Sequence, residues 1–385
     1  AVVISGGLAV FGWGEAATWL RWTNQSIPTR SASASAPLGE YIFELQATAG
    51  DAQKGLNQLY QLLPPKRVTS LRGQTVSIGA WIWASQPVQL TPLTLTMVDL
   101  QGIETRQTQP FTIGETPVFY SFSTTVPDEA SRGWILLSAT APEAPEVTVF
   151  FDGLVLAEGQ FALSEVPAWD NSDGNMGTWG GQRFENLVRN PSAEAAGIGF
   201  RAWVDRLGEK ILPAWERPSM VLYSLQDRAG AGWYYEVTAQ NLLRTFWGKF
   251  GWGHVLLLGS KTYLVLGVVT AIGALGTILA LGKLSKKTLW EALFFLGVAT
   301  LSIWAFAWMR GSYYLIYRTF IPAARYAFPV IIPTLAFFWL GWVAITQKLS
   351  ALTRMPNKIW VGLYGLFGLG VSALSMASII VYYYG

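Results

Sequence analysis

The sequence contains no cysteine and a single histidine, His254. Without cysteine the chain has no disulfide and no thiol chemistry, so an exposed domain must be held together by its core alone. One histidine excludes, within this chain, histidine-based catalytic triads and metal sites built from several histidines. The formal net charge of +3 over 385 residues is too small to indicate nucleic-acid binding.

Hydrophobic residues make up 51% of the chain, and most of the excess follows His254. Four apolar runs there have the length that a membrane-spanning helix needs, roughly 20 residues. The sequence therefore predicts a transmembrane region of about four helices over residues 256–385, with spans at 256–281, 289–309, 328–346 and 360–382. Glycines within it would let helices approach closely, namely Gly267, Gly273, Gly276, Gly365, Gly368 and Gly370.

Basic residues in the short loops predict the orientation of these spans, because cytoplasmic loops carry an excess of Lys and Arg. They gather after the first span and after the third, which places the large N-terminal part outside the cell membrane. The residues concerned are Lys283, Lys286, Lys287, Lys348, Arg354 and Lys358.

Three arginines depart from this rule: Arg310, Arg318 and Arg325 lie in the connection predicted to be outside. One interpretation is an anionic partner, a lipid phosphate or a diphosphate, held by the forked guanidinium groups. The other is ordinary snorkelling of arginines to the headgroup layer.

The stretch at residues 244–255, RTFWGKFGWGHV, stands between the two parts of the chain. Aromatic rings and cations of this kind suit the headgroup layer of a bilayer, and its glycines permit a bent, non-helical segment. We predict an interfacial segment, with an aromatic linker as the alternative. Its candidate membrane-interface residues are Phe246, Trp247, Phe250 and Trp252, with Lys249 among them.

Residues 41–156 contain short runs rich in β-formers, separated by Pro, Gly and Asp. Such spacing without helical periods predicts an antiparallel β-sandwich or jelly roll of about 120 residues. The Ser/Ala run at residues 31–36 has no periodicity and predicts a linker. The predicted strands are residues 41–48, 74–84, 93–99, 118–126, 134–140 and 147–156.

The order of these runs resembles the jelly-roll carbohydrate-binding modules of the galactose-binding-like superfamily. The cues are KGLNQLYQLL, LRGQTVSIGAWIWAS, TPVFYSFSTTVPD and FFDGLVLAEG, and the resemblance covers residues 23–161. NLVRNPSAE at residues 186–194 is similar to the opening phrase of such modules, although no complete second module follows. The resemblance implies glycan binding, although many such modules serve only as scaffold.

Two kinds of side chain in this region are candidates for binding. Trp81 and Trp83 lie two residues apart on one predicted strand, so they share a face and either stack on a sugar or fill the core. Asp152 stands where the resembled family often holds a structural calcium. One aspartate supplies few of the six to eight oxygens that calcium takes, so a turn or strand-edge Asp is the alternative.

Two segments show no sustained periodicity. Residues 162–243 are rich in Trp and Gly and predict extended loops, with a short β-like or helical segment at 220–226 and an amphipathic helix at 240–246 on the bilayer surface. Residues 1–22 begin with the apolar stretch AVVISGGLAVFGW, which is too short to span a membrane and has no basic region typical of a signal peptide. It predicts the end of a spanning helix whose beginning is missing, or an amphipathic or buried segment.

A second resemblance rests on TFWGKFGWGHV at residues 245–255 and ARYAFPVIIP at 324–333. Together they are similar to the C-terminal part of bacterial multi-pass membrane proteins related to the GT-C glycosyltransferases. The resemblance implies transfer of sugar from a polyprenyl-phosphate donor on the outer face. It assigns contact with the donor phosphate or lipid to Arg325 and Tyr326, with Arg318, Arg310 and Lys249 near them. The family's acidic catalytic residue belongs to a region absent from this chain, so no catalytic residue is assigned.

Two functions fit these patterns. The first is the extracytoplasmic domain and membrane bundle of a glycosyltransferase-like protein in envelope glycan assembly. The second is a non-catalytic, membrane-anchored glycan-binding or structural subunit of a larger complex. Both place the chain in the bilayer with a glycan and other membrane chains as partners, and neither requires a cofactor beyond the calcium considered at Asp152.

Overall fold

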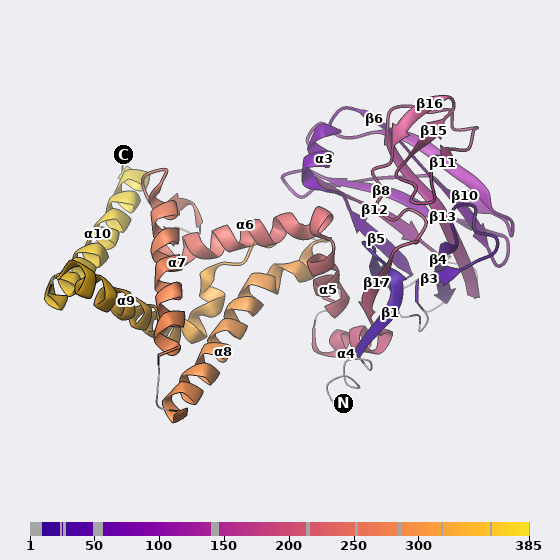
Figure 1. Ribbon diagram of the computed structural model, residues 1–385. Helices are drawn as coiled ribbons and strands as arrows, with labels where there is room; N and C mark the ends of the chain where they lie inside the picture. The colour runs from indigo at the N-terminus through magenta and orange to yellow at the C-terminus, as the bar shows by residue number, and fades with distance from the viewer. Residues whose placement is uncertain are drawn as a thin grey trace. The chain divides into compact units, whose positions relative to one another are not determined.

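The computed structural model describes residues 10–23, 25, 28–48, 57–139, 146–212, 216–250, 253–283, 287–316, 319–354 and 356–384. The chain divides into two compact units. Unit 1 comprises Ala1–Trp233 and Ser312–Phe320, and unit 2 comprises Tyr234–Gly311 and Ile321–Gly385. Figure 1 shows the labelled strands gathered in unit 1 and the long helices α7 to α10 in unit 2.

Unit 1 is built on two five-stranded antiparallel sheets, which confirms the predicted β-sandwich. The first sheet has the order β11 (Val118–Thr125), β6 (Thr75–Ala84), β13 (Glu146–Glu158), β4 (Tyr41–Thr48) and β3 (Arg30–Ala32). The second has the order β2 (Leu20–Trp22), β5 (Gln58–Leu62), β12 (Arg132–Ser138), β8 (Leu93–Val98) and β9 (Glu104–Thr108). A short pair, β7 (Val88–Leu90) with β10 (Phe111–Ile113), and helix α3 (Pro65–Ser70) complete this part.

The core of the sandwich follows from the two-residue period of its strands. In β6, Ile78, Ala80 and Ile82 are fully buried in the core cluster, together with side chains from β5, β8 and β12 of the other sheet. Alternate residues of the same strand point to the opposite face. Trp81 and Trp83 therefore share the face turned away from the main core, as their spacing predicts.

The predicted linker at residues 31–36 is wrong in its first part, because Arg30–Ala32 forms β3 at the edge of a sheet. Its ladder to β4 supplies backbone hydrogen bonds that no side-chain period reveals. The Arg30 guanidinium lies 3.2 Å from the centroid of the Tyr41 ring and donates to the carbonyls of Ala193 and Glu194. These tertiary contacts hold a short strand of poor local propensity.

Regular structure also replaces the loops predicted for residues 162–243. A small sheet consists of β14 (Ala168–Trp169), β15 (Met176–Trp179) and β16 (Gln182–Glu185). It is followed by β17 (Ala196–Phe200) and by helices α4 (Ala202–Ile211), α5 (Pro218–Gln226) and α6 (Arg228–Trp247). The predicted segment at 220–226 lies in α5 and is helical, and the predicted helix at 240–246 is the last part of α6.

The N-terminal segment differs from the prediction where it is described. Residues 1–9 lie outside the described residues, and Phe11–Ala16 forms strand β1 rather than the end of a helix. β1 pairs with β17, and the Phe11 and Phe200 rings stack with centroids 5.1 Å apart. Pairing with a strand almost 190 residues later was not readable from the local apolar run.

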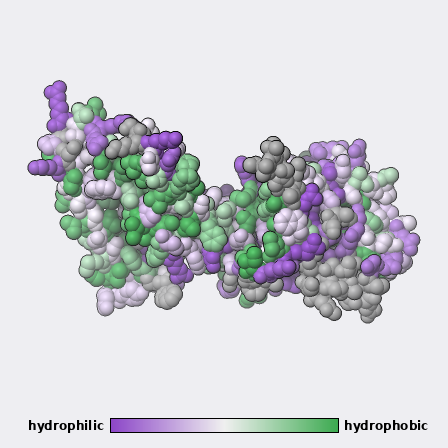
Figure 2. Space-filling model, turned by 90° about the horizontal axis from the view of Figure 1, so that it is seen from below, coloured by the Kyte–Doolittle hydropathy of each residue, from purple (hydrophilic) through white to green (hydrophobic). Residues whose placement is uncertain are grey.

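Among the described residues of unit 2, four helices are long and apolar enough to cross a membrane, as predicted. They are α7 (Thr262–Leu281), α8 (Lys287–Met309), α9 (Ile331–Thr353) and α10 (Asn357–Tyr384). Two 3-10 helices, η2 (Arg310–Tyr314) and η3 (Ala324–Val330), stand between α8 and α9. Figure 2 shows a largely hydrophobic surface over these helices.

The first span is shorter than predicted at its N-terminal end. α6 ends at Trp247, and a short antiparallel pair, β18 (Lys249–Phe250) with β19 (Val255–Leu256), precedes α7. Gly248 and Gly253 have φ of +157° and +94° there, in line with the predicted non-helical bend.

Glycines decide how closely α7 and α9 pack. A Cβ atom on Gly341 would lie 2.0 Å from the carbonyl oxygen of Gly273, and one on Gly276 would lie 2.2 Å from the carbonyl oxygen of Gly341. Two predicted glycines, Gly273 and Gly276, therefore form the crossing, and Gly341 is the partner that the prediction missed. Gly365, Gly368 and Gly370 on α10 have no described neighbour within 4 Å of an added Cβ.

Candidate functional site

Two of the three exceptional arginines meet at one aromatic ring in unit 2. α8 ends at Met309 and turns into η2 at Arg310, while Arg325 and Tyr326 lie in η3. The Arg310 Cζ lies 4.7 Å and the Arg325 Cζ 5.5 Å from the centroid of the Tyr326 ring. Both guanidinium groups thus make cation–π contacts with the same side chain.

These two cations have no carboxylate partner among the residues that the structure describes. The Nε of Arg310 is buried and has no hydrogen-bond partner there. Two guanidinium groups at one ring repel each other, and a buried N–H donor without an acceptor is unfavourable. An oxyanion bound at the Arg310 guanidinium would supply the missing acceptor and offset part of the positive charge.

Lys249 is linked to the segment before η3 through one side chain. Its Nζ donates to Asn241 Oδ1 at 2.9 Å, and Asn241 Nδ2 donates to the carbonyl of Pro322 at 2.9 Å. The Ala324 N–H donates to Thr245 Oγ1 at 2.8 Å. The C-terminal end of α6 therefore fixes the segment that leads into η3. Arg318, the third exceptional arginine, lies outside the described residues.

An apolar cavity of about 480 Å³ lies among α6, α7, α8 and α9. Its threonine hydroxyls donate to backbone carbonyls. Those of Thr270, Thr300 and Thr334 donate to Leu266, Leu296 and Val330 in their own helices, and that of Thr277 donates to Gly273 of α7 and to Phe337 of α9. The lining is therefore hydrocarbon in character. Its remaining residues include Leu242, Leu243, Phe246, Ala274, Gly297, Leu301, Trp304, Phe337 and Phe338.

The cavity and the ring of Tyr326, which holds the arginine pair, are connected through the same packed side chains. Leu242 and Trp304 line the cavity; Leu242 belongs to a buried cluster with Ala307 and Ala327, and both Trp304 and Tyr326 pack against that cluster. Trp304 Nε1 also donates to Thr334 Oγ1 at 3.0 Å, which fixes its ring at the wall. A cationic group therefore adjoins an apolar cavity, an arrangement complementary to a molecule with an anionic head and a hydrocarbon tail.

The predicted interface residues fall into different environments. Phe246 lies with its ring centroid 5.9 Å from that of Trp304, and Trp247 Nε1 donates to Thr270 Oγ1 at 2.9 Å. Both are partly buried against other helices of unit 2, and Phe250 lies in β18. Trp252 lies outside the described residues. Interfacial placement of these aromatics stays a prediction.

The two candidate sugar-stacking tryptophans differ in access. Trp83 is 6% exposed and stacks on Phe150 at 5.4 Å between centroids, so its face is covered. Trp81 is only partly buried and meets Phe119 edge-on at 5.8 Å. Phe119 in turn contacts Trp179 beneath the small sheet. Trp81 is the one of the pair with some surface left for a ligand.

Asp152 is fully buried at a bulge of β13. Its Oδ2 accepts the N–H of Leu38 at 2.6 Å and its Oδ1 accepts that of Gly153 at 2.7 Å. Burial raises the pKa of Asp152 to about 8, and the charge of Glu194 acts in the same direction, although the two N–H groups lower it. No group of three His, Asp or Glu suited to a metal was found among the described residues. Calcium at Asp152 stays a prediction.

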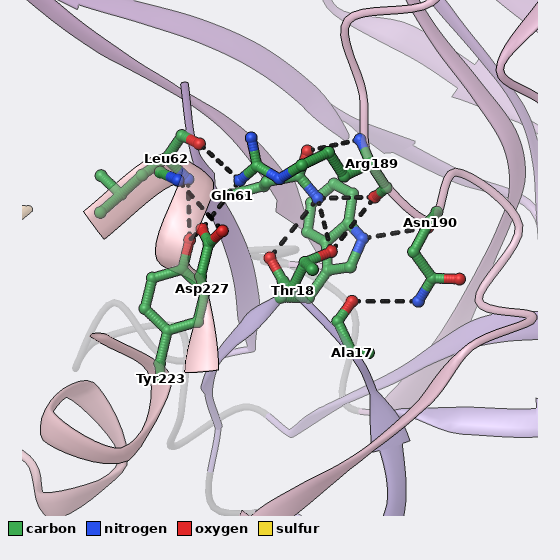
Figure 3. A network of polar contacts seen from close by, with 10 residues as sticks. Ala17, Thr18, Gln61, Leu62, Arg189, Asn190, Tyr223 and Asp227 are labelled. Carbon is green, nitrogen blue, oxygen red and sulfur yellow. Dashed lines mark hydrogen bonds and ion pairs between the residues drawn. The ribbon is translucent and has the colours of Figure 1, made fainter. Parts of the chain in front are cut away.

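A polar network in unit 1 was not predicted from the sequence (Figure 3). Asp227 is 1% exposed and accepts from Arg189 Nη2 at 2.8 Å and from the Tyr223 hydroxyl at 2.6 Å. Its Oδ1 accepts the Gly230 N–H at the first turn of α6, so it also caps that helix. Arg189 Nη2 further donates to the Leu62 carbonyl at the end of β5.

The segment NLVRNPSAE, residues 186–194, takes part in this network. The backbone N–H of Arg189 donates to Gln61 Oε1, and the Gln61 amide donates to the Arg189 carbonyl at 2.7 Å. Trp19 Nε1 donates to the Asn190 carbonyl. This segment, called the strap below, connects β16 to β17 and fixes the beginning of α6 to the sandwich. The only sign of it in the sequence was its similarity to the first residues of carbohydrate-binding modules.

No family model and no curated protein matches this chain. Its sandwich is similar to solved structures. One titled "CBM4 structure and function" shares 16% identity at a TM-score of 0.27, over 38% of this chain and 89% of the other. The CBM22-1–GH10 modules of Clostridium thermocellum xylanase 10B, complexed with xylohexaose, share 13% sequence identity at a TM-score of 0.28. The match covers 40% of this chain and 28% of that one. The enzymatically active domain of bacteriophage CBA120 tailspike protein 4 shares 16% sequence identity at a TM-score of 0.27. The match covers 38% of this chain and 20% of that one. At these values the likeness reaches no further than the sandwich.

Proposed function

We propose that this chain is the extracytoplasmic domain and C-terminal membrane bundle of a glycosyltransferase-like protein acting on polyprenyl-phosphate-linked sugar in envelope glycan assembly. The observation that carries the proposal is the pair Arg310 and Arg325 at Tyr326, without a described carboxylate partner, beside an apolar cavity. Forked guanidinium groups bind phosphate oxygens through paired, charge-assisted hydrogen bonds. The cavity offers hydrocarbon surface to the first part of a prenyl tail.

Two observations support an outward-facing sandwich. Residues 312–320, from the connection between α8 and α9, belong to the same compact unit as the sandwich, and Arg132 Nη1 donates to the Leu315 carbonyl at 3.4 Å. The connections after α7 and after α9 carry Lys283, Lys287 and Arg354, which favours the cytoplasmic side for them. The arginine pair would then lie at the outer end of the bundle.

The proposal is tested by binding of a polyprenyl phosphate to the full chain in lipid nanodiscs. Arg310→Gln and Arg325→Gln should each weaken binding roughly tenfold or more, the effect of losing a hydrogen bond to a charged group. Lys348→Gln, an exposed cation near the other end of α9, is the matched control and should bind like the parent chain. A prenol of the same length without phosphate should bind all variants equally.

A second arm tests the cavity. Ala274→Leu places extra methyl groups into the apolar space and should weaken binding of the long-chain ligand while leaving inorganic diphosphate unaffected. Equal binding of the prenyl phosphate to the parent, Arg310→Gln and Arg325→Gln chains would refute the assignment of the site.

The alternative is a non-catalytic, membrane-anchored glycan-binding or structural subunit. One observation favours it: unit 2 contains only two acidic residues, Glu236 and Glu291, and neither is bonded to the arginine pair in the described structure. Glycosyl transfer assays with a polyprenyl-phosphate sugar distinguish the two, because only the first function gives turnover. Glycan-array binding that is lost in Trp81→Ala but retained in Trp83→Phe would support the second.

A further inference from the structure

Helix α4 in unit 1 is fixed by a buried face. Asp205 is fully buried and accepts both the N–H of Ser219, at 3.0 Å, and its hydroxyl at the start of α5. Gly208 packs so closely on Pro218 that an added Cβ would lie 2.7 Å from its Cδ. With Ala202 these residues form one side of the helix, and Glu209 beside them pairs with Arg217. Because this side of α4 faces the protein, the opposite side faces outward.

The opposite side of α4 carries an exposed apolar stripe. Trp203, Leu207 and Ile211, spaced by four residues, are 43%, 49% and 75% exposed. Arg206 and Lys210 are exposed and flank this stripe one residue earlier in each turn. At 3.6 residues per turn the stripe and the two cations occupy one outward sector, which contains no acidic residue. Large apolar side chains in that pattern are unusual on a face turned to water.

The surface continues onto the strand pair that leads into α4. β17 ends at Phe200, directly before the helix, and its partner β1 carries Trp13, which is 67% exposed. α4, β1 and β17 lie at the same edge of unit 1 in Figure 1. Exposed tryptophans beside Arg and Lys are the composition found where proteins meet the headgroup layer.

We propose that the Trp203, Leu207 and Ile211 face of α4 binds the surface of a lipid bilayer rich in anionic lipid, and so forms a membrane contact of unit 1 separate from the four spans. The two cations match anionic headgroups, and the apolar stripe suits the boundary between headgroups and acyl chains. The bilayer is the occupant within reach, since the chain runs from Ile211 to its first spanning helix in about 50 residues. This inference does not depend on the lipid-phosphate site.

The absence of cysteine makes a direct test simple, because one introduced thiol is the only labelling site. A nitroxide is attached to Leu207→Cys, or in a second preparation to Ile211→Cys, in the full chain in nanodiscs of phosphatidylcholine with phosphatidylglycerol. The matched control is Leu100→Cys, at the 81% exposed turn between β8 and β9. Collision rates are measured with oxygen, which concentrates in lipid, and with a water-soluble nickel chelate.

At Leu207 and Ile211 oxygen collisions should exceed nickel collisions, at a depth of roughly 5–10 Å into the headgroup and acyl boundary. At Leu100 the order should be reversed. Replacing Arg206 and Lys210 together by Glu should abolish the excess at Leu207, whereas Lys66→Glu should leave it unchanged.

Three results would overturn the proposal. A label at Leu207 as open to nickel as that at Leu100 would mean that the face remains in water. A label shielded from both reagents would mean that protein covers it, either another segment of the chain or a partner. Dipolar broadening that disappears on dilution with unlabelled chain would identify a second copy as the occupant.

Discussion

Ionisation of Asp152 should make the stability of the sandwich fall as the pH rises. The side chain is fully buried, and burial raises its pKa from an ordinary value near 3.8 to about 8. A raised acid pKa means that the folded chain holds a proton which the unfolded chain has lost. The stabilising effect is complete below the unfolded pKa and is lost as the pH rises towards 8.

The magnitude follows from the shift. Between pH 5 and pH 7 unfolding releases about one proton, which lowers the free energy of unfolding by about 1.4 kcal/mol per pH unit and about 2.7 kcal/mol in total. For a domain of this size that amounts to roughly 5–10 °C in the unfolding midpoint. Asp152→Asn keeps the size of the side chain, cannot ionise, and should remove this slope.

The assay is scanning calorimetry of the full chain in nanodiscs, comparing the sandwich transition of parent and variant at each pH. The difference in midpoint should shrink or reverse as the pH rises, while Asp173→Asn, at an exposed position, should keep the parent's slope. Parallel curves for parent and Asp152→Asn would refute the reasoning. Added calcium that stabilises the parent at pH 7 but not Asp152→Asn would instead support a metal at this carboxylate.

Two further predictions concern packing and the strap. Gly341→Ala should lower the thermal unfolding midpoint of unit 2, because its Cβ would meet the Gly273 carbonyl at an overpacking cost of roughly 1–3 kcal/mol. Gly362→Ala on α10, where an added Cβ has no described neighbour within 4 Å, should leave the midpoint unchanged. Equal midpoints for the two variants would contradict the close crossing of α7 and α9. Arg189→Met should destabilise unit 1 by about 3–5 kcal/mol in denaturant titrations because it leaves Asp227 buried and unpaired, and a second change, Asp227→Asn, should recover part of that loss.

The sequence determined the features that depend on local pattern. Runs rich in β-formers and bounded by turn residues, such as residues 41–48 and 118–126, became strands, as their composition predicts. The apolar runs became helices long enough to span a membrane because their length matches a bilayer. The two-residue period of a strand placed Trp81 and Trp83 on one face.

The tertiary structure decided which distant residues meet. Arg310 and Arg325 are separated by 14 residues, and no periodicity shows that η2 and η3 bring both to Tyr326. Asp152 reads as a turn or edge residue, yet it is fully buried because the ladders of β13 with β4 and β6 enclose it.

Long-range pairing also decided where regular structure forms. β1 is a strand because β17 lies beside it, and the strap around Arg189 is ordered by Gln61 and Asp227 from other elements. Local sequence sets the period, length and polarity of a segment, and those properties were predictable. Burial and charge pairing depend on neighbours far along the chain, and only the folded structure supplies them.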